Sequence, residues 1–174
     1  MTRPKPRRVL LVALALALIG LAYAVLVEPR RLVVRAETIT PPGWPAALDR
    51  LRVVVLSDVH TGAPGMSTAR LERVVERVND ARPDLVLLAG DYVIHGVVGG
   101  RFVPPDVTAR LLGRIEARLG TYAVLGNHDW WQGRREVEAA FLAAGIPVLD
   151  DRARALGEGE ERFWVVGVSD LWEG

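Results

Sequence analysis

The pattern of apolar positions divides the chain into a long hydrophobic segment and a region of short alternating elements. Residues 9–27, VLLVALALALIGLAYAVLV, contain no charge and are apolar on every side of a helix. A helix rises about 1.5 Å per residue, so this segment is long enough to cross a hydrocarbon layer of about 30 Å. We predict a membrane helix at 9–27, after a basic tail at 1–8. A juxtamembrane connector at 28–51 follows, and its RRLVVRAETIT stretch is predicted to be an edge strand.

From residue 52 onward, apolar runs typical of strands alternate with helical periodicity. The runs that predict buried strands lie at 52–56, 85–88, 122–125, 146–149 and 163–168. Apolar residues spaced three or four apart predict helices that begin at 67–68, 104–106 and 134, and end at 79–83, 120 and 145. This alternation predicts an α/β domain at 52–174, with a parallel sheet covered on both faces.

The charges are unevenly distributed along the chain. Four of the 22 basic residues, Arg3, Lys5, Arg7 and Arg8, precede the apolar segment, and the remainder is net acidic. Positive charges before a membrane helix stay in the cytoplasm, which predicts a single-pass protein of the inner (cytoplasmic) membrane with an extracytoplasmic domain. An acidic remainder without a basic stripe argues against nucleic acid as a partner. The absence of cysteine excludes a disulfide framework and thiolate metal ligands.

The apolar segment also fits two kinds of secretion signal. Ala22-Tyr23-Ala24 matches the cleavage pattern of a signal peptide, and Arg7-Arg8 loosely matches a twin-arginine signal. We favour an uncleaved signal anchor because the apolar run is longer than the core of a usual signal peptide. All three interpretations place the domain outside the cytoplasm.

Polar residues follow three of the predicted strands at the point where each strand ends. These are Ser57-Asp58-Val59-His60, Gly90-Asp91-Tyr92 and Gly126-Asn127-His128-Asp129. Parallel strands end at the same edge of a sheet, so Asp58, His60, Asp91, Asn127 and His128 are expected to converge. Oxygen ligands mixed with imidazole suit Mn, Fe or Zn, and two such ions hold a phosphate between them. Each motif alone is also ordinary turn chemistry, but their ordered succession favours a metal site.

Taken together, the motifs Asp58-x-His60, Gly90-Asp91 and Gly126-Asn127-His128-Asp129 resemble those of the calcineurin-like metallophosphoesterase superfamily. The blocks look closest to its membrane-associated bacterial phosphodiesterase branch, and the resemblance covers about residues 50–171, including VVGVSD at 165–170. The resemblance implies a β-sandwich flanked by helices, of which about the first half is present. It also implies a dinuclear metal site that hydrolyses phosphomonoesters or phosphodiesters.

The resemblance also implies a role for each motif residue. Asp58 and His60 would bind the first metal, Asp91 would bridge both metals, and Asn127 would bind the second. His128 would lie beside the substrate phosphate, with Asn127, and protonate the leaving oxygen. Asp129 would assist catalysis by orienting His128 or its loop.

The sequence departs from the family pattern in its histidines. Complete members carry further metal-binding histidines later in the chain, whereas this chain has three, at 60, 95 and 128. We therefore expect a C-terminally truncated member, incomplete in its metal site. Many phosphatases of the superfamily have an Asp where this chain has Ile94, which disfavours the protein Ser/Thr phosphatase subgroup. His95 is expected to be a solvated loop histidine.

The leading hypothesis is a membrane-anchored, extracytoplasmic, metal-dependent phosphoester hydrolase. Anchoring favours a lipid-linked or nucleotide–lipid phosphodiester as its substrate. Trp44, Trp130 and Trp131 are candidates for a membrane interface or the wall of an apolar acyl pocket, with core packing as the alternative. The competing hypothesis is a non-catalytic or inactive membrane protein that retains the fold. A nuclease is disfavoured by the acidic balance of the domain.

Overall fold

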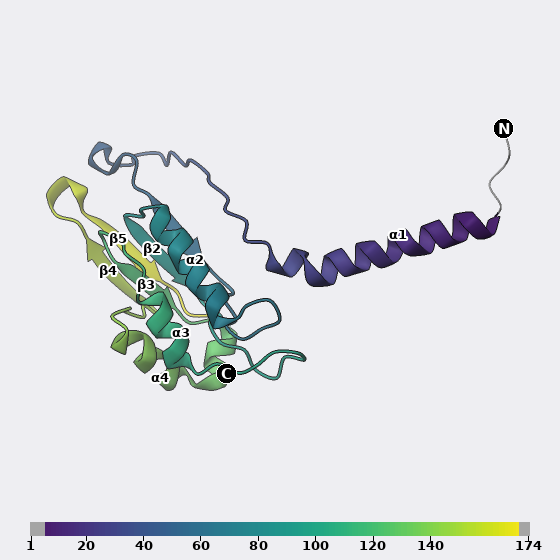
Figure 1. Ribbon diagram of the computed structural model, residues 1–174. Coiled ribbons are helices and arrows are strands. Elements are labelled where there is room, and N and C mark those ends of the chain that lie inside the picture. Colours follow the sequence, from purple (N-terminus) through teal and green to yellow (C-terminus); the bar gives the residue numbers. More distant parts are fainter. Residues whose placement is uncertain (1–5, 171–174) are drawn as a thin grey trace. The chain divides into compact units, whose positions relative to one another are not determined.

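The computed structural model describes residues 6–170, which fall into two units. The first unit, within residues 1–36, contains α1 (Pro6–Leu26) and the short 3-10 helix η1 (Glu28–Arg30). The second, residues 37–174, contains every strand and the other helices of the described chain, which Figure 1 labels. Arg3 and Lys5 of the basic tail, and residues 171–174 of the predicted domain, lie outside the described residues.

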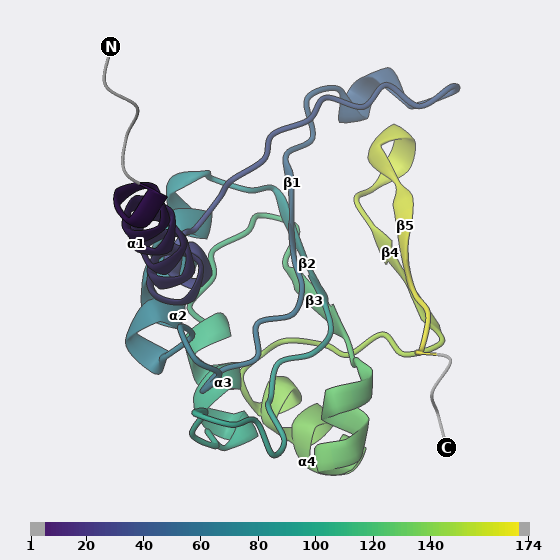
Figure 2. The ribbon, with the colours of Figure 1, turned by 90° about the vertical axis from the view of Figure 1, so that its right-hand side faces the viewer.

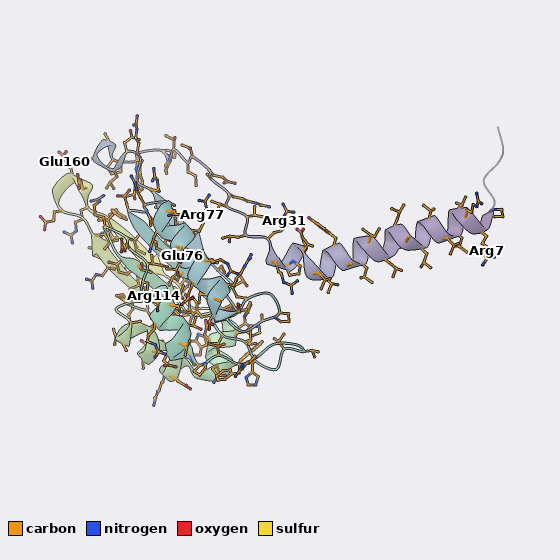
Figure 3. All side chains as sticks on the ribbon, viewed as in Figure 1. Arg7, Arg31, Glu76, Arg77, Arg114 and Glu160 are labelled. Atoms are coloured by element: carbon orange, nitrogen blue, oxygen red, sulfur yellow. The ribbon has the colours of Figure 1, made fainter. Side chains whose placement is uncertain are left out.

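Helix α1 confirms the predicted apolar helix. None of its residues is buried, and the stretch Pro6–Arg30 is long and apolar enough to cross a membrane, by length and composition. Arg7 lies near the start of α1 and Arg31 just beyond its other end (Figure 3). The uncharged part of the helix is therefore flanked by arginines on both sides.

The edge strand predicted within 28–51 does not form, so that prediction is wrong. Residues 31–40 belong to no helix or strand, and Leu32, Val33 and Val34 are all exposed. A strand is stable only when a neighbour pairs with its backbone. Among the described residues, no backbone hydrogen bond joins 32–40 to another strand. The alternation of polar and apolar residues was therefore insufficient evidence for a strand here.

The centre of the second unit is a parallel sheet, as predicted. It consists of β1 (Val53–Leu56), β2 (Leu85–Ala89) and β3 (Thr121–Val124), in the order β1-β2-β3. The predicted strand at 146–149 is reduced to one parallel bridge between Ala123 and Val148. All these segments run in the same direction, so their carboxyl ends meet at one edge of the sheet.

Helices cover one face of this sheet (Figure 2). Helix α2 (Thr68–Asp80) begins at Ser67, whose hydroxyl accepts a hydrogen bond from the backbone N–H of Arg70 at 3.3 Å, as expected of a cap. Its buried residues pack with those of α3 (Pro105–Leu112) and α4 (Asn127–Ala143) in the main core. The largest fully buried members of that core are Tyr92, Phe141, Leu71, Leu88 and Leu112.

Two helix boundaries differ from the prediction. Helix α3 ends at Leu112, not near Gly120, because the side chain of Asn79 in α2 hydrogen-bonds the backbone of the residues that follow Leu112. The Asn79 amide donates to the Arg114 carbonyl (3.0 Å) and accepts from the Glu116 N–H (2.9 Å). Helix α4 begins at Asn127 rather than Arg134, and a kink at Gly133 (φ 134°) separates its first turns from the predicted part.

A β-hairpin lies on the other face of the sheet (Figure 2). It pairs β4 (Arg152–Leu156) with β5 (Phe163–Gly167) in antiparallel register, and β4 was not predicted. A second core, Leu85, Tyr122, Leu149 and Leu156, joins the sheet to the hairpin. The predicted α/β class with a parallel sheet between two layers is confirmed.

Candidate metal centre

The loops that follow β1 and β2 continue the parallel pairing of these strands. The N–H of Asp58 donates to the Gly90 carbonyl (3.1 Å), that of His60 to the Asp91 carbonyl (2.9 Å), and that of Thr61 to the Tyr92 carbonyl (2.9 Å). These hydrogen bonds fix Asp58 and His60 beside Asp91, as the predicted convergence of the strand ends requires.

Three residues of these loops adopt an unusual backbone conformation. Asp58, His60 and Asp91 have φ values of 53°, 41° and 60°, in the left-handed region that side-chain-bearing residues seldom adopt. Such conformations carry strain and are concentrated at functional sites. The side chains nevertheless converge: Nε2 of His60 lies 3.8 Å from Oδ1 of Asp58 and 3.8 Å from Oδ2 of Asp91.

The two carboxylate oxygens of Asp91 have different partners. Oδ1 accepts a hydrogen bond from the backbone N–H of His128 (3.0 Å) in the first turn of α4, where the helix dipole favours a negative charge. Oδ2 lies near His60, at the distance given above. Gly126 is necessary for this arrangement, because a Cβ on it would lie 2.2 Å from Oδ1 of Asp91.

The orientation of the His60 ring leaves one nitrogen available for a metal. Its Nδ1–H donates to the Val93 carbonyl at 3.1 Å, since a carbonyl oxygen can only accept. In the neutral ring this leaves the lone pair on Nε2, the nitrogen that faces the two carboxylates. A hydrogen bond of this kind, from the far nitrogen to a backbone carbonyl, is typical of metal-binding histidines.

His128 completes the group. Its ring lies 4.7 Å from the ring of His60, edge to face. One ligand atom each from His60, Asp91 and His128 lie within 4.8 Å of one another. Two ligand atoms each about 2 Å from one ion are at most about 4 Å apart, so these side chains would rotate slightly toward one another to bind it. Nδ1 of His128 is buried and has no hydrogen-bond partner among the described residues, an unpaired state that a metal or substrate would relieve. The residues present therefore fit a divalent metal.

Asp58 and Asn127 lie at the margin of this group. The Asp58 side chain is 67% exposed, and its Oδ2 accepts a hydrogen bond from the Ser57 hydroxyl at 2.6 Å. Asn127 is the first residue of α4, directly before His128. The structure thus brings Asp58, His60, Asp91 and His128 together, and these four residues are called the metal group below. Asn127 lies at the same edge of the sheet.

Asp129 occupies a different position from the one expected of a catalytic residue. Its side chain is fully buried and accepts four backbone hydrogen bonds, from Asp91 (2.8 Å), Tyr92 (2.9 Å), Val93 (3.3 Å) and Gly126 (3.0 Å). Burial raises the pKa of its carboxyl group, and these N–H donors oppose that rise. Asp129 therefore ties the loop after β2 to the start of α4. Of the two roles weighed for it, this geometry corresponds to orienting the loop of His128.

The three tryptophans singled out in the sequence lie in different environments. Trp131 is 59% exposed, and its ring lies 5.0 Å from that of His128, at the wall of the metal group. Trp130 packs against the main core. Trp44 is partly exposed and donates to the Leu48 carbonyl at 3.0 Å. His95 is exposed on its loop, as predicted.

Two residues that support the site were missed in the sequence. The Tyr92 hydroxyl donates to the Val124 carbonyl (2.7 Å) and accepts from the Gly90 N–H (3.1 Å), and burial raises its pKa well above the ordinary value. Asp150 is buried and accepts a hydrogen bond from the Leu125 N–H at 3.0 Å. Asp150 follows a predicted strand directly, the signal that identified Asp58 and Asp91. No pattern in the sequence distinguishes Tyr92.

Comparison with known families accounts for this arrangement. The family model described as calcineurin-like phosphoesterase matches residues 51–166, which include every residue of the metal group. The chain belongs to the calcineurin-like phosphoesterase family. The family is metal-dependent, which agrees with the His and Asp group that the described residues contain.

Individual relatives come from animals and bacteria. A transmembrane protein with metallophosphoesterase domain from Danio rerio is 34% identical over 133 residues, which cover 73% of this chain and 29% of that protein. Phosphodiesterase YaeI of Escherichia coli is 33% identical over 98 residues (55% of this chain, 35% of that protein). UDP-2,3-diacylglucosamine pyrophosphatase LpxG of Chlamydia trachomatis is 33% identical over 85 residues (49% and 24%).

The matches confirm the superfamily, and the bacterial branch stays a prediction, because animal transmembrane proteins match the chain as well as bacterial ones. The chain spans less than a third of the length of the animal relatives named as transmembrane proteins. No solved structure matches the chain.

Proposed function

We propose that this protein is a metal-dependent phosphoester hydrolase, a phosphodiesterase or phosphatase. The observation that carries the proposal is the convergence of Asp58, His60, Asp91 and His128 at one edge of the sheet, inside the family-matched region. Phosphodiesterase YaeI and pyrophosphatase LpxG, which resemble the chain, are named for reactions of phosphate esters and anhydrides.

Each residue has a proposed role. Asp58 and His60 would hold one divalent ion, Mn, Fe or Zn, Asp91 would contact two such ions, and Asn127 would hold the second and contact the substrate. When bound, such ions neutralise the phosphate and supply a nucleophile at neutral pH. His128 would bind beside the phosphate and donate a proton to the leaving oxygen. Asp129 would keep His128 and Asp91 in place through its backbone hydrogen bonds.

The proposed location is a bacterial inner membrane, with the domain on the extracytoplasmic side. The boundaries proposed are a basic tail at 1–8, the anchor at 9–27, a connector at 28–51 and the phosphoesterase domain from residue 52. Arg7 and Arg8 before the helix favour this orientation, and the Danio rerio relative is named as a transmembrane protein. A substrate linked to a lipid would be within reach of an anchored domain. LpxG, by its name, acts on a diacylated sugar nucleotide.

One observation favours the competing function, in which the protein binds metal or phosphate without turnover. Within residues 6–170, the structure has one group of three His or Asp ligands that fit a metal, and Asp58 beside it is largely exposed. Three protein ligands suffice for one catalytic zinc but are few for two tightly held ions.

The proposal is tested by metal-stimulated hydrolysis of bis-p-nitrophenyl phosphate by the purified chain in detergent. We expect Mn²⁺ or Zn²⁺ to stimulate the reaction, and Asp91→Asn to lower the rate by at least a hundredfold. Asp80→Asn, the same change at an exposed position on α2, is the matched control and should leave the rate unchanged. Metal binding without hydrolysis would favour the competing function. Equal rates for Asp91→Asn and Asp80→Asn would overturn the proposed site.

A further inference from the structure

A cavity of about 440 Å³ opens on the loop between β2 and α3. It is lined by Ile94, His95, Val97, Phe102 and Gln132, together with glycines of the same loop. None of the assigned roles of the metal group involves these residues. The cavity therefore needs an explanation of its own.

Two lining residues of the cavity directly follow residues that contact His60 or His128. On one side, Ile94 follows Val93, whose carbonyl accepts the hydrogen bond from His60. On the other side, Gln132 follows Trp131, whose ring contacts that of His128. A phosphate held by His60 and His128 would therefore have its organic group within reach of this cavity.

The loop that forms the cavity is anchored to the loop after β1. The Arg101 N–H donates to the Gly62 carbonyl at 2.8 Å, and a Cβ on Gly62 would lie 2.0 Å from the Arg101 carbonyl oxygen. Within the loop, the Gly100 N–H donates to the Val97 carbonyl, and a Cβ on Gly100 would lie 2.8 Å from Cδ1 of Ile94. The glycines thus allow a close backbone approach that fixes the cavity wall beside His60.

The lining indicates what kind of group would enter. It contains no Asp, Glu, Lys or Arg side chain, and its polar side chains are those of His95 and Gln132, so it offers no permanently charged partner for a second phosphate. Val97 and Phe102, 37% and 50% exposed without a ligand, supply most of the accessible apolar surface, while Ile94 is 4% exposed. Apolar surface next to a site for an anion is suited to a substrate with a charged head and an aliphatic chain.

We propose that this cavity binds the aliphatic chain of the organic group attached to the substrate phosphate. The inference rests on the proposed function, because the metal group must first hold the phosphate head. It assigns substrate selection to the loop 94–102 and Gln132, which differ in role from the residues that hold the metals. The apolar chain, not a second charge, is what the protein would recognise.

The test compares methylphosphonate with hexylphosphonate, which share one head group and are not hydrolysed. The full chain in nanodiscs with Zn²⁺ is titrated with each, and binding is followed through the δ1 methyl groups of its five isoleucines. Ile94 lies in the cavity, while Ile115 and Ile146 are buried in the core and serve as internal references. We expect hexylphosphonate to bind about tenfold more tightly, because the open cavity removes only part of the chain from water. The Ile94 methyl signal should move, and those of the references should not.

Two substitutions in the same loop provide the matched comparison. Val97→Trp fills the cavity and should reduce the hexyl-to-methyl affinity ratio to below about two. Val98→Trp is the same change at a neighbouring residue that is 94% exposed and outside the lining, so the ratio should persist. Partitioning of hexylphosphonate into lipid is the same for both variants. If Val97→Trp disturbs the Ile115 or Ile146 signals, Phe102→Ala, which removes apolar wall, replaces it and should also lower the ratio.

The outcomes separate this inference from the function on which it rests. Equal affinity for the two phosphonates, or a shift of the reference methyls without Ile94, would overturn the cavity assignment while leaving the metal site intact. If phenylphosphonate bound more tightly than methylphosphonate while hexylphosphonate did not, the assignment of the cavity to an aliphatic chain would be overturned. Failure of Zn²⁺ and methylphosphonate to bind at all would instead overturn the proposed function, and this inference with it.

Discussion

The Asp129 carboxylate accepts a hydrogen bond from the backbone N–H of Tyr92 at 2.9 Å, joining the first turn of α4 to the loop after β2. Three further N–H groups, those of Asp91, Val93 and Gly126, point at the same carboxylate. Both loops carry residues of the metal group. A buried side chain hydrogen-bonded only to backbone therefore holds Asp91 and the start of α4, which carries His128, in position relative to each other.

We predict that Asp129→Asn destabilises the protein and weakens metal binding. Each Asp129 oxygen accepts two N–H groups, and an amide can offer only one oxygen, so two buried donors would lose their acceptor and face an NH₂ group. The expected loss is about 3 kcal/mol in the free energy of unfolding. Urea denaturation and Zn²⁺ titration measure the two effects. Asp106→Asn, at an exposed position paired with Arg110, should change neither. Normal stability of Asp129→Asn would contradict this role.

Gly126→Ala is predicted to weaken metal binding and to disturb the loop after β2, because the added Cβ would also lie 2.7 Å from the backbone nitrogen of Asp91. The added methyl would overlap Oδ1 of Asp91, and so displace the carboxylate that faces His60. We expect the affinity for Zn²⁺ to fall by more than tenfold, as measured by calorimetric titration. Gly20→Ala in α1 adds a methyl where nothing lies within 4 Å, and its affinity should equal that of the wild type. Unchanged affinity of Gly126→Ala would mean that Asp91 is not a ligand.

The convergence of the residues at the strand ends could be predicted from the sequence because it follows from local rules. Asp58 and Asp91 each follow a short apolar run, and parallel strands bring such positions to one edge. The contact between Asp129 and the loop 91–93 is different, since it joins residues 36 to 38 positions apart through backbone donors. Every residue except proline has a backbone N–H, so the residue types at 91–93 do not indicate that Asp129 accepts hydrogen bonds from them.

The same distinction between local and tertiary information explains which strands were predicted wrongly. Leu32, Val33 and Val34 form a short apolar run of the kind found in strands, but nothing in their own sequence supplies a pairing neighbour. Strand β4 is exposed at Arg152 and Arg154, and it forms because it pairs with β5 and because Leu156, at its end, packs with Leu85 and Tyr122. In both cases tertiary contacts, not local preference, decide whether a strand exists.

Asn79→Ala is predicted to release the segment that follows α3. The Asn79 side chain both donates to and accepts from the backbone of Arg114 and Glu116, so its loss leaves these groups to water. We expect a loss of about 1–2 kcal/mol in the free energy of unfolding. Faster amide hydrogen exchange at Glu116 would accompany it. Asp80→Ala, the next residue of α2, is exposed and should leave both measurements unchanged. Equal exchange rates at Glu116 would show that the α3 boundary has another cause.

The last prediction concerns the opposite edge of the sheet, where Asp84 joins the starts of β1 and β2. Its carboxylate accepts hydrogen bonds from the Arg52 N–H (2.9 Å) and the Arg118 side chain (3.0 Å). The Arg52 hydrogen bond, followed by Arg118, lowers the pKa of Asp84 below its ordinary value of 3.8, against the opposing effect of burial. A lowered pKa in the folded state means that the carboxylate stabilises the fold above the ordinary pKa and loses this effect as pH falls through the folded value.

Asp84→Asn should therefore be less stable than the wild type at pH 7, by about 1 kcal/mol. The difference should begin to shrink as pH falls below the ordinary pKa of 3.8 and disappear as pH falls through the lower pKa of the folded state, where the wild-type carboxylate is protonated and resembles the neutral amide. Urea denaturation of both proteins between pH 2 and 7 measures it. Asp80→Asn, whose carboxylate is exposed, should show no such pH-dependent difference. If the difference in the free energy of unfolding instead widened toward low pH, the charged Asp84 carboxylate would destabilise the fold, which would contradict the role assigned to its two donors.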